Sequence, residues 1–510
     1  DFGITKDGAG ALTLSNANTF TGPVNLKAGT LNLGNAAALG STNATLTIDG
    51  GTLDNTSAGT LTLSGSKAII VNGDFAFTGT QSLNLGTGAV TFNATPKITV
   101  NANTLTVGGA ITGGAYGITK DGAGTLLLSV ANTMTGPVTI KAGTLSVGNA
   151  GSLGTPSSIV FDGGVLNNTT GGSIALAPSS IAINGSFGIS GVEGFNLGTA
   201  PVTLTATPDI NVTIGTSTTR SLTLGGVISG DGFGITKSGL STLNLTGANT
   251  FTGPVTVNAG TLNLGNATAL GGSTSLTLNG GTINASTAAI TLPNGSTVAI
   301  NGNFAFTGNK AIDFGTTSSV TIVNTPTISV ANTLTIGGVI TGGTSGLTKA
   351  GTGTLVLKGS NDFSGDVSVT GGVIDVYNDN ALGTSTKLIL AGGAINNYSG
   401  AERTLANNPE ITVSGLLSSS LSKKLNMGTG AVTLAGNTTF KAYGSAGVVY
   451  GGPVAGAGYD MTFNYSGMMQ FDGNMSNVNA INLTSTNGGK VILNGNNSNI
   501  GTITVSGGSL

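Results

Sequence analysis

The chain contains no cysteine, no histidine and no tryptophan among its 510 residues. Without cysteine it can form no disulfide, no thiolate nucleophile and no thiolate metal site. Without histidine it lacks the commonest general base and the commonest transition-metal ligand. Most familiar catalytic and metal sites therefore cannot be built from this composition, and we expect no enzymatic activity, no metal and no cofactor.

Charge is also scarce. Charged residues make up 7% of the chain, with 17 basic against 19 acidic side chains and a net charge of -2. This balance provides neither a basic face for phosphates nor an acidic tail, so nucleic acid is not an expected partner. No run of 18 apolar residues occurs, and the sequence predicts no membrane insertion by a helix. The chain opens and stops inside repeats, with DFGITKDGAG and VSGGSL, and we expect a longer precursor.

Repetition is the dominant feature of what remains. A GITK or GLTK tetrapeptide starts at Gly3, Gly117, Gly234 and Gly346, so that successive copies differ in sequence number by 114, 117 and 112. A second marker lies at Gly86, Gly198, Gly315 and Gly428, where the sequence numbers differ by 112, 117 and 113. Because the two markers agree, the sequence contains a super-repeat of about 114 residues.

A finer period appears within each super-repeat. Short pieces such as VTV, LTL and VAI alternate apolar and polar residues, as strands do, and turn-forming residues separate them. Equivalent pieces start at Val255, Leu276, Val298 and Val320, whose sequence numbers differ by 21, 22 and 22. Three short strands and three turns fit one such step. The pattern therefore predicts an all-β, right-handed, three-sided parallel β-solenoid with about 22 residues per coil.

The same periods suggest the domain organisation. We expect a continuous solenoid over residues 1–440, with super-repeats at 1–116, 117–233, 234–345 and 346–440. Residues 441–487 depart from the pattern and are rich in Tyr and Met. A truncated repeat resumes at 488–510.

One octapeptide marks each super-repeat. ANTFTGPV begins at Ala17 and again at Ala248, and its variants are ANTMTGPV and SNDFSGDV. We interpret it as a corner in which Asn and Gly supply turn backbone. The expected apolar plugs of this corner are Phe20, Met134, Phe251 and Phe363.

Residues 117–154, GITKDGAGTLLLSVANTMTGPVTIKAGTLSVGNAGSLG, closely resemble the passenger-associated transport repeat, also called the autotransporter-associated β-strand repeat. The resemblance recurs at 3–40, at 234–271 and, more loosely, at 346–383. It implies the exported passenger of a Gram-negative bacterium, extracellular at the cell surface, with a C-terminal translocator barrel in the precursor. The repeat motif carries no catalytic residue.

An enzyme that acts on polysaccharides is an alternative interpretation of a parallel β-helix. Such enzymes need clustered carboxylates, so the positions of the acidic residues test this alternative. Several acids are replaced by Asn, Ser or Ala in other super-repeats, as turn residues would be. One concentration remains, at Asp362, Asp366, Asp375 and Asp379. Its spacing matches no loop motif for Ca²⁺, and we interpret these four side chains as a solvated edge.

One lysine is kept in every super-repeat, at Lys6, Lys120, Lys237 and Lys349. A row of cations for an anionic surface is one interpretation. The spacing of about five coils is too sparse for that. We therefore expect long exposed side chains that guard turns and strand edges.

The off-pattern segment contains four of the seven tyrosines and four of the six methionines. Either it packs into the core as a variant coil, or it forms an interface, where such side chains are enriched. The candidate interface residues are Tyr443, Tyr450, Tyr459, Tyr465, Met468, Met469 and Phe471.

The sequence as a whole favours a non-catalytic structural or adhesive solenoid at the cell surface. Its expected partners are copies of itself or molecules of a host or neighbouring surface. A self-assembling subunit of an extracellular fibre or sheath is the main alternative, and a polysaccharide-acting enzyme is a more distant one.

Overall fold

The computed structural model describes residues 2–41, 44–216, 220–444, 446–484 and 488–507. These residues form β-strands joined by turns, and they contain no helix. Accordingly, no membrane-crossing helix is found in the described parts of the chain. The chain divides into two compact units, Asp1–Gly253 with Thr268–Gly271, and Pro254–Ala267 with Gly272–Leu510.

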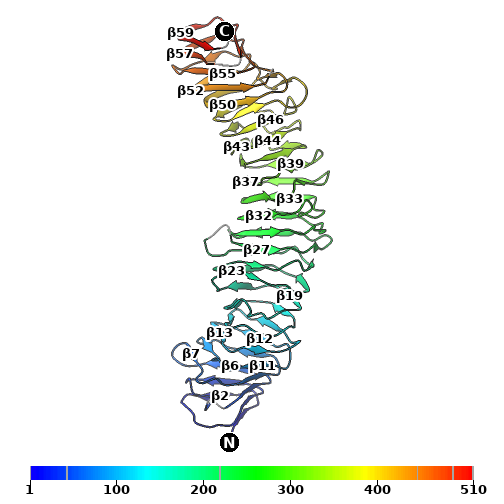
Figure 1. The fold of residues 1–510 in the computed structure, drawn as a ribbon, viewed down its shortest axis with the longest axis vertical. Coiled ribbons are helices and arrows are strands. Elements are labelled where there is room, and N and C mark those ends of the chain that lie inside the picture. The colour runs from blue at the N-terminus through cyan, green and yellow to red at the C-terminus, as the bar shows by residue number, and fades with distance from the viewer. Residues whose placement is uncertain (1, 42–43, 217–219, 445, 485–487, 508–510) are drawn as a thin grey trace. The chain divides into compact units, whose positions relative to one another are not determined.

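Each unit is a stack of coils joined by parallel strand pairing (Figure 1). Val24 pairs with Leu46, Leu46 with Ile69, and Ile69 with Val90, and the sequence numbers of these pairs differ by 22, 23 and 21. The inward-facing apolar residues of the strands are buried, while many of the Thr, Asn and Ser residues between them face outward. The alternation of apolar and polar residues along each strand thus places one set of side chains in the core. The step of about 22 residues brings equivalent strands of successive coils side by side.

Unit 1 carries three sheets over its first coils and a fourth that begins further along the chain. The first sheet contains β1 (Ile4–Lys6), β3 (Val24–Leu26), β5 (Leu46–Ile48), β8 (Ile69–Val71), β11 (Val90–Phe92) and β14 (Ile111–Thr112). The second contains β2 (Ala11–Leu14), β4 (Thr30–Leu33), β6 (Thr52–Asn55), β9 (Phe75–Phe77), β12 (Lys97–Val100), β15 (Ile118–Asp121), β17 (Val138–Ile140), β19 (Ser158–Phe161), β22 (Ser180–Ile183), β25 (Val202–Leu204) and β28 (Ile228–Ser229). The third contains β7 (Leu61–Thr62), β10 (Leu83–Asn84), β13 (Thr104–Val107), β16 (Thr125–Leu128), β18 (Thr144–Val147), β20 (Val165–Asn168), β23 (Phe187–Gly191), β26 (Asp209–Val212) and β29 (Ile235–Ser238), and the fourth contains β21 (Ile174–Ala175), β24 (Phe195–Asn196), β27 (Ser221–Leu224) and β30 (Thr242–Leu245).

Unit 2 is built in the same way. One set of strands contains β31 (Val255–Val257), β33 (Ser275–Leu278), β36 (Thr297–Ile300), β39 (Ser319–Ile322) and β42 (Val339–Thr341). A second contains β32 (Thr261–Leu264), β34 (Thr282–Ala285), β37 (Phe304–Phe306), β40 (Thr327–Val330), β43 (Leu347–Ala350), β45 (Val367–Val369), β47 (Lys387–Ala391), β50 (Glu410–Ser420), β52 (Val432–Tyr443), β54 (Val454–Ala455), β55 (Met461–Tyr465), β57 (Met475–Thr484) and β59 (Ser498–Gly507). The remaining strands are β35 (Ile290–Thr291), β38 (Ile312–Asp313), β41 (Thr333–Ile336), β44 (Thr354–Leu357), β46 (Val373–Val376) and β48 (Ala394–Asn396), followed in another sheet by β49 (Arg403–Thr404), β51 (Leu425–Asn426), β53 (Gly447–Tyr450), β56 (Met468–Phe471) and β58 (Lys490–Leu493).

The predicted three-sided parallel solenoid is confirmed by this order of strands. The consecutive strands β8, β9 and β10 each enter a different sheet, and β11, β12 and β13 repeat the order one coil later. The segment predicted to be off-pattern also forms strands: β53 pairs in parallel with β56, and β55 with β57. The described residues of this segment, 441–444 and 446–484, therefore form coils of the solenoid, although their sequence departs from the repeat.

Candidate functional site

The octapeptide corner occupies one side of a coil that has only two strands. Between β16 and β17 the chain forms no strand, and residues 129–137 run along the third side. There the buried Asn132 accepts a hydrogen bond at Oδ1 from Ile111 N, 2.7 Å away in the preceding coil. Its Nδ2 donates to Ser152 O in the following coil. One side chain thereby provides hydrogen bonds that backbone strands make elsewhere.

The corner recurs with the same bonds. Asn249 accepts from Ile228 N at 2.9 Å and donates to Ala269 O at 2.6 Å. Asn361 accepts from Ile340 N at 2.8 Å and donates to Ala381 O at 2.6 Å. The prediction that this Asn supplies turn backbone was therefore wrong, because its buried side chain links three coils. The sequence signal was the presence of Asn in all four octapeptides, including Asn18.

The expected apolar plugs are confirmed at three corners. Met134, Phe251 and Phe363 are fully buried, whereas Phe20 is partly exposed. Glycine is required beside the plug because the backbone of the preceding coil lies close: a Cβ at Gly136 would come within 2.3 Å of Gly117 N. Such an approach is far below van der Waals contact, so the corner accepts no side chain there.

The repeated lysines are buried, which corrects the prediction that they are exposed guards. Lys120, Lys237 and Lys349 are 0% exposed and Lys6 is 6% exposed. Lys120 Nζ donates to the carbonyl oxygens of Asp121, Gly122 and Ala142 at 2.8, 2.7 and 3.1 Å. Lys6 and Lys349 each donate to three carbonyl oxygens in the same positions. The sequence could not show this burial, since a lysine in a polar turn is usually exposed.

This carbonyl cradle links adjacent coils. Asp121 and Gly122 belong to the turn that follows the lysine, whereas Ala142 belongs to the next coil. Burial lowers the pKa of Lys120, Lys237 and Lys349 from 10.5 to about 8. The amines therefore hold the interior of the repeat together and form no row of cations for an anionic ligand.

The four concentrated aspartates do not converge. Asp366 lies 3.5 Å from Lys387 Nζ, and Asp379 lies 3.7 Å from Arg403. Asp362 is exposed, and its backbone N–H donates to Ile340 O. Within the ranges that the structure describes, no group of three or more acidic side chains is placed to hold a metal ion.

Asp375 corrects the prediction that all four aspartates form a solvated edge. Its side chain is only 6% exposed, and Oδ1 accepts a hydrogen bond from Tyr398 N at 3.1 Å. Burial raises the pKa of this carboxyl from 3.8 to about 6, although the backbone bond acts in the opposite direction. Asn32 and Asn263 take the same place in the repeat, so position alone does not require a charge.

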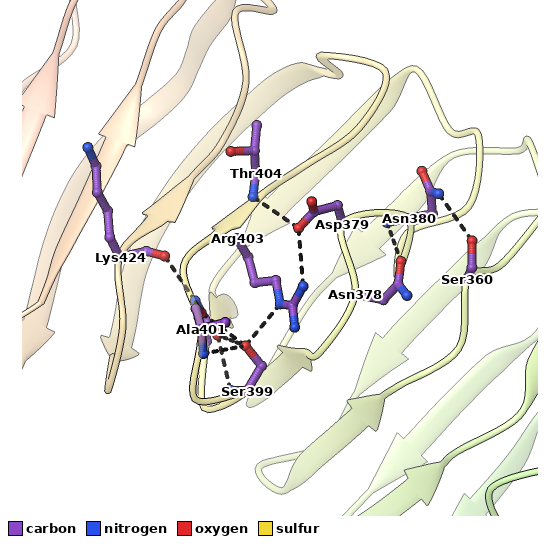
Figure 2. Close-up of polar contacts among 10 residues, drawn as sticks. Ser360, Asn378, Asp379, Asn380, Ser399, Ala401, Arg403, Thr404 and Lys424 are labelled. Carbon is purple, nitrogen blue, oxygen red and sulfur yellow. Dashed lines mark hydrogen bonds and ion pairs between the residues drawn. The ribbon is translucent and has the colours of Figure 1, made fainter.

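Asp379 belongs to a polar network that holds the neighbouring coil (Figure 2). It accepts a hydrogen bond from Thr404 N at 3.2 Å, and Arg403 Nε donates to Ser399 Oγ at 3.0 Å. The buried Asn397 donates to Ala401 O and to Lys424 O, both at 2.9 Å. These contacts connect consecutive coils of unit 2 and hold the turn that leads into β49.

The candidate interface residues separate into buried and exposed groups. Tyr450, Met469 and Phe471 are at most 4% exposed, so they are not available to a partner. Tyr443 and Tyr459 are 51% and 39% exposed, and Met468 is half-buried. The side chain of Tyr465 lies outside the described residues.

The buried aromatics form one cluster in the core. Phe440 stacks on Phe463 at 5.2 Å between ring centres, and Tyr450 stacks on Phe471 at 5.1 Å. The two stacks meet edge to face, with Phe440 6.1 Å from both rings of the other stack. Burial raises the pKa of the Tyr450 hydroxyl. The alternative of an aromatic-filled variant coil therefore describes this part of the segment.

A protein-family model matches the four segments of the chain that contain the octapeptide corner. The model of the passenger-associated-transport-repeat family matches residues 4–33, 118–147, 235–264 and 347–376. Each match contains four strands, the octapeptide corner and the buried lysine. The sequence numbers at which the matches start differ by 114, 117 and 112, which confirms the predicted super-repeat.

The chain is also similar to the adhesin BmaC autotransporter of Brucella suis biovar 1 (strain 1330), with 29% identity over 593 residues. The similarity covers 86% of this chain but only 17% of that protein. No solved structure gave a significant match. The chain thus carries four passenger-associated-transport repeats, one in each of its super-repeats, on a parallel β-solenoid that is similar to part of an autotransporter adhesin.

Proposed function

We propose that this chain is a non-catalytic, adhesive part of an autotransporter passenger, extracellular at the bacterial cell surface. The main support is the combination of a parallel solenoid with similarity to an adhesin along 86% of the chain. In this role the coils present binding surfaces away from the membrane. The remainder of the precursor supplies a C-terminal translocator domain.

The interior of the repeat supports a mechanical role. Lysine cradles and corner asparagines each bridge neighbouring coils through buried hydrogen bonds, for example from Lys120 to Ala142 and from Asn249 to Ile228. Buried polar groups of this kind are costly to separate, because each would lose its partner without water to replace it. The coils thereby resist separation when the surface is pulled.

Contact with a partner is assigned to the exposed residues of the off-pattern segment. Tyr443 and Tyr459 present large amphipathic rings to solvent, and such rings are enriched at protein interfaces. Tyr450 and Phe471 are buried in the core and take no direct part. The partner is a host or neighbouring surface molecule, with a second copy of the chain as the alternative.

Deletion in the intact bacterium tests the proposal. Cells that produce the precursor without residues 1–510 should bind cultured host cells less than cells with the whole precursor, while an epitope placed outside the deletion stays at the surface. Tyr443→Ser with Tyr459→Ser should also reduce binding. Tyr116→Ser, which changes an exposed tyrosine of unit 1, is the matched control.

Unchanged binding after the deletion would refute the adhesive role. Binding that persists in the double tyrosine variant would refute the assigned contact alone. Ultracentrifugation of the purified chain separates the two kinds of partner: concentration-dependent association that Tyr443→Ser and Tyr459→Ser abolish would identify a second copy.

A further inference from the structure

A row of tyrosines crosses consecutive coils on one side of unit 2. Asp375 of β46 pairs with Asn396 of β48, and Tyr377 and Tyr398 each follow the paired residue by two positions. The two tyrosines therefore lie at the same place in neighbouring coils, about 4.8 Å apart. Tyr377 is half-buried, and Tyr398 is 44% exposed.

The row continues over the next two coils. The hydroxyl groups of Tyr398 and Ser420 are hydrogen-bonded to each other, and Ser420 of β50 pairs with Tyr443 of β52. The bond to Ser420 fixes the orientation of the Tyr398 ring, so a ligand that packs on this ring loses little affinity to ordering of the side chain. Tyr443 is 51% exposed. We call Tyr377, Tyr398, Ser420 and Tyr443 the tyrosine row.

The large side chains of the row are particular to the fourth super-repeat. The residues that correspond to Tyr377 in the first three super-repeats are Gly34, Gly148 and Gly265. Those that correspond to Tyr398 are Thr56, Thr169 and Ser286. Because small residues complete the coil in three super-repeats, the packing of the solenoid does not require the two rings. They add contact surface to the fourth.

Lysines flank the row. Lys358 Nζ lies 5.6 Å from the centre of the Tyr377 ring, which is a cation–π contact. Lys441 lies two residues before Tyr443 on β52, and so on the same face of that strand. Lys423 is exposed in the turn after β50. Within the described ranges none of these three lysines forms a salt bridge.

Little negative charge opposes the three ammonium groups. Asp375 is only 6% exposed, and Asp379 lies 3.7 Å from the guanidinium of Arg403. Glu402 is exposed in the turn after Tyr398 and leaves the three lysines in excess. The surface along the row therefore combines exposed aromatic rings with a net positive charge, and it is complementary to an anionic ligand.

We propose that the tyrosine row binds an acidic glycan with one carboxylate on every second sugar. Sugar rings pack on the tyrosine rings, sugar hydroxyls bond to the phenol groups and to Ser420, and the carboxylates pair with the lysines. Four steps of the ladder, from β44 through β46, β48 and β50 to β52, separate Lys358 from Lys441, which is about 19 Å. Charge of this low density does not suit a nucleic acid, which has one phosphate per roughly 3.4 Å of each strand.

This inference deepens the proposed function and rests on the adhesive role for its setting at the cell surface. Binding of a soluble glycan is measured with the purified chain, whereas adhesion is measured with bacteria, so the two can fail separately. A variant that no longer binds the glycan while its cells still adhere would refute the row as the adhesive contact and leave the adhesive role standing.

Isothermal titration calorimetry of the purified chain tests the row, with hyaluronate oligosaccharides as the acidic probe, dextran as the neutral probe and an oligothymidylate as the nucleic-acid probe. Hyaluronate should bind the wild type, and dextran should bind at least about tenfold more weakly. Tyr398→Ala, and Lys358→Gln combined with Lys441→Gln, should each lower the affinity for hyaluronate at least about tenfold. Tyr116→Ser combined with Lys97→Gln, which changes exposed side chains of unit 1, is the matched control and should bind as the wild type does.

Three results would overturn the proposal. The first is the absence of binding between hyaluronate and the wild type. The second is an affinity for hyaluronate that is the same in Tyr398→Ala, in the double lysine variant and in the wild type. The third is tighter binding of the oligothymidylate than of hyaluronate, which would assign the row to single-stranded nucleic acid. Thermal unfolding establishes that each variant is folded, and Tyr443→Ala replaces Tyr398→Ala if the latter unfolds.

Discussion

Replacing Lys120 by methionine separates the hydrogen bonds of the carbonyl cradle from its charge. The substitution keeps the apolar stem and removes the amine, so the carbonyl oxygens of Asp121, Gly122 and Ala142 lose their donor. Leaving a buried acceptor unpaired costs about 1–3 kcal/mol, while removing a buried charge recovers part of that cost. We expect a net loss of about 2–4 kcal/mol in the free energy of unfolding near neutral pH.

Raising the pH should increase the free energy of unfolding of the wild-type chain, whereas Lys120→Met should lower it. The pKa of Lys120, Lys237 and Lys349 is about 8 in the folded chain and 10.5 in the unfolded chain. Between these values the unfolded chain binds more protons, so stability rises with pH, by at most about 1.4 kcal/mol per pH unit for each lysine. The neutral amine still donates to the carbonyls, so the cradle survives deprotonation.

Urea unfolding followed by circular dichroism at pH 7.5 and pH 9.5 measures both effects, and hydrogen exchange of peptides from 118–165 localises them. Lys141→Met is the matched control, because Lys141 is half exposed and its ammonium lies 3.8 Å from Asp162; such pairs contribute about 0–1 kcal/mol. Equal stability of Lys120→Met and wild type would refute the role of the cradle. A wild-type stability that falls between the two pH values, or a rise of the same size after all three lysines are replaced by methionine, would refute the pKa argument.

Three further predictions concern the interior of the solenoid. Asn249→Ala leaves Ile228 N and Ala269 O without partners and should cost about 2–4 kcal/mol in urea unfolding, whereas Asn93→Ala at an exposed turn should change stability by less than about 0.5 kcal/mol. Asp375→Asn should raise the free energy of unfolding at pH 7 by about 1 kcal/mol after allowance for screening by water. The pKa of Asp375 is about 6 in the folded chain and 3.8 in the unfolded chain, so the stability of the wild type should fall as the pH rises from 4 to 6. An equal fall in the variant would contradict this reasoning. Tyr450→Ser should destabilise the chain by about 3–5 kcal/mol, because it removes a ring from the core. Tyr443→Ser, which changes an exposed ring, should leave the midpoint of thermal unfolding unchanged. Equal effects of the two substitutions would contradict the distinction between core and surface tyrosines.

The architecture was predictable because it depends on local and periodic features. Alternating apolar residues set the strands, Gly and Asn set the turns, and a regular step such as Val298 to Val320 sets the coil. A solenoid repeats one set of contacts, so a period in the sequence becomes a period in space. The plugs Met134 and Phe251 were predictable for the same reason, since a bulky apolar residue at a repeated corner belongs in the core.

Which polar side chains are buried could not be derived from the period of the sequence repeat. Lys120 lies near the end of β15 and Lys141 directly follows β17, yet the first is buried among carbonyls and the second is exposed. Asp366 and Asp375 are close in sequence, yet only Asp375 is buried. Burial of these groups depends on the side of the coil that each residue faces and on what the coils above and below place against it.

The sequence by itself therefore determined the class of fold, the length of the coil, the super-repeat and the resemblance to passenger repeats. Only the tertiary structure decided which Asn and Lys side chains bridge coils, and which aromatics of the off-pattern segment are core. The physical reason is that strand patterning arises from neighbours along the chain. Hydrogen-bond partners and burial arise from residues one coil away, whose side chains differ from one coil to the next.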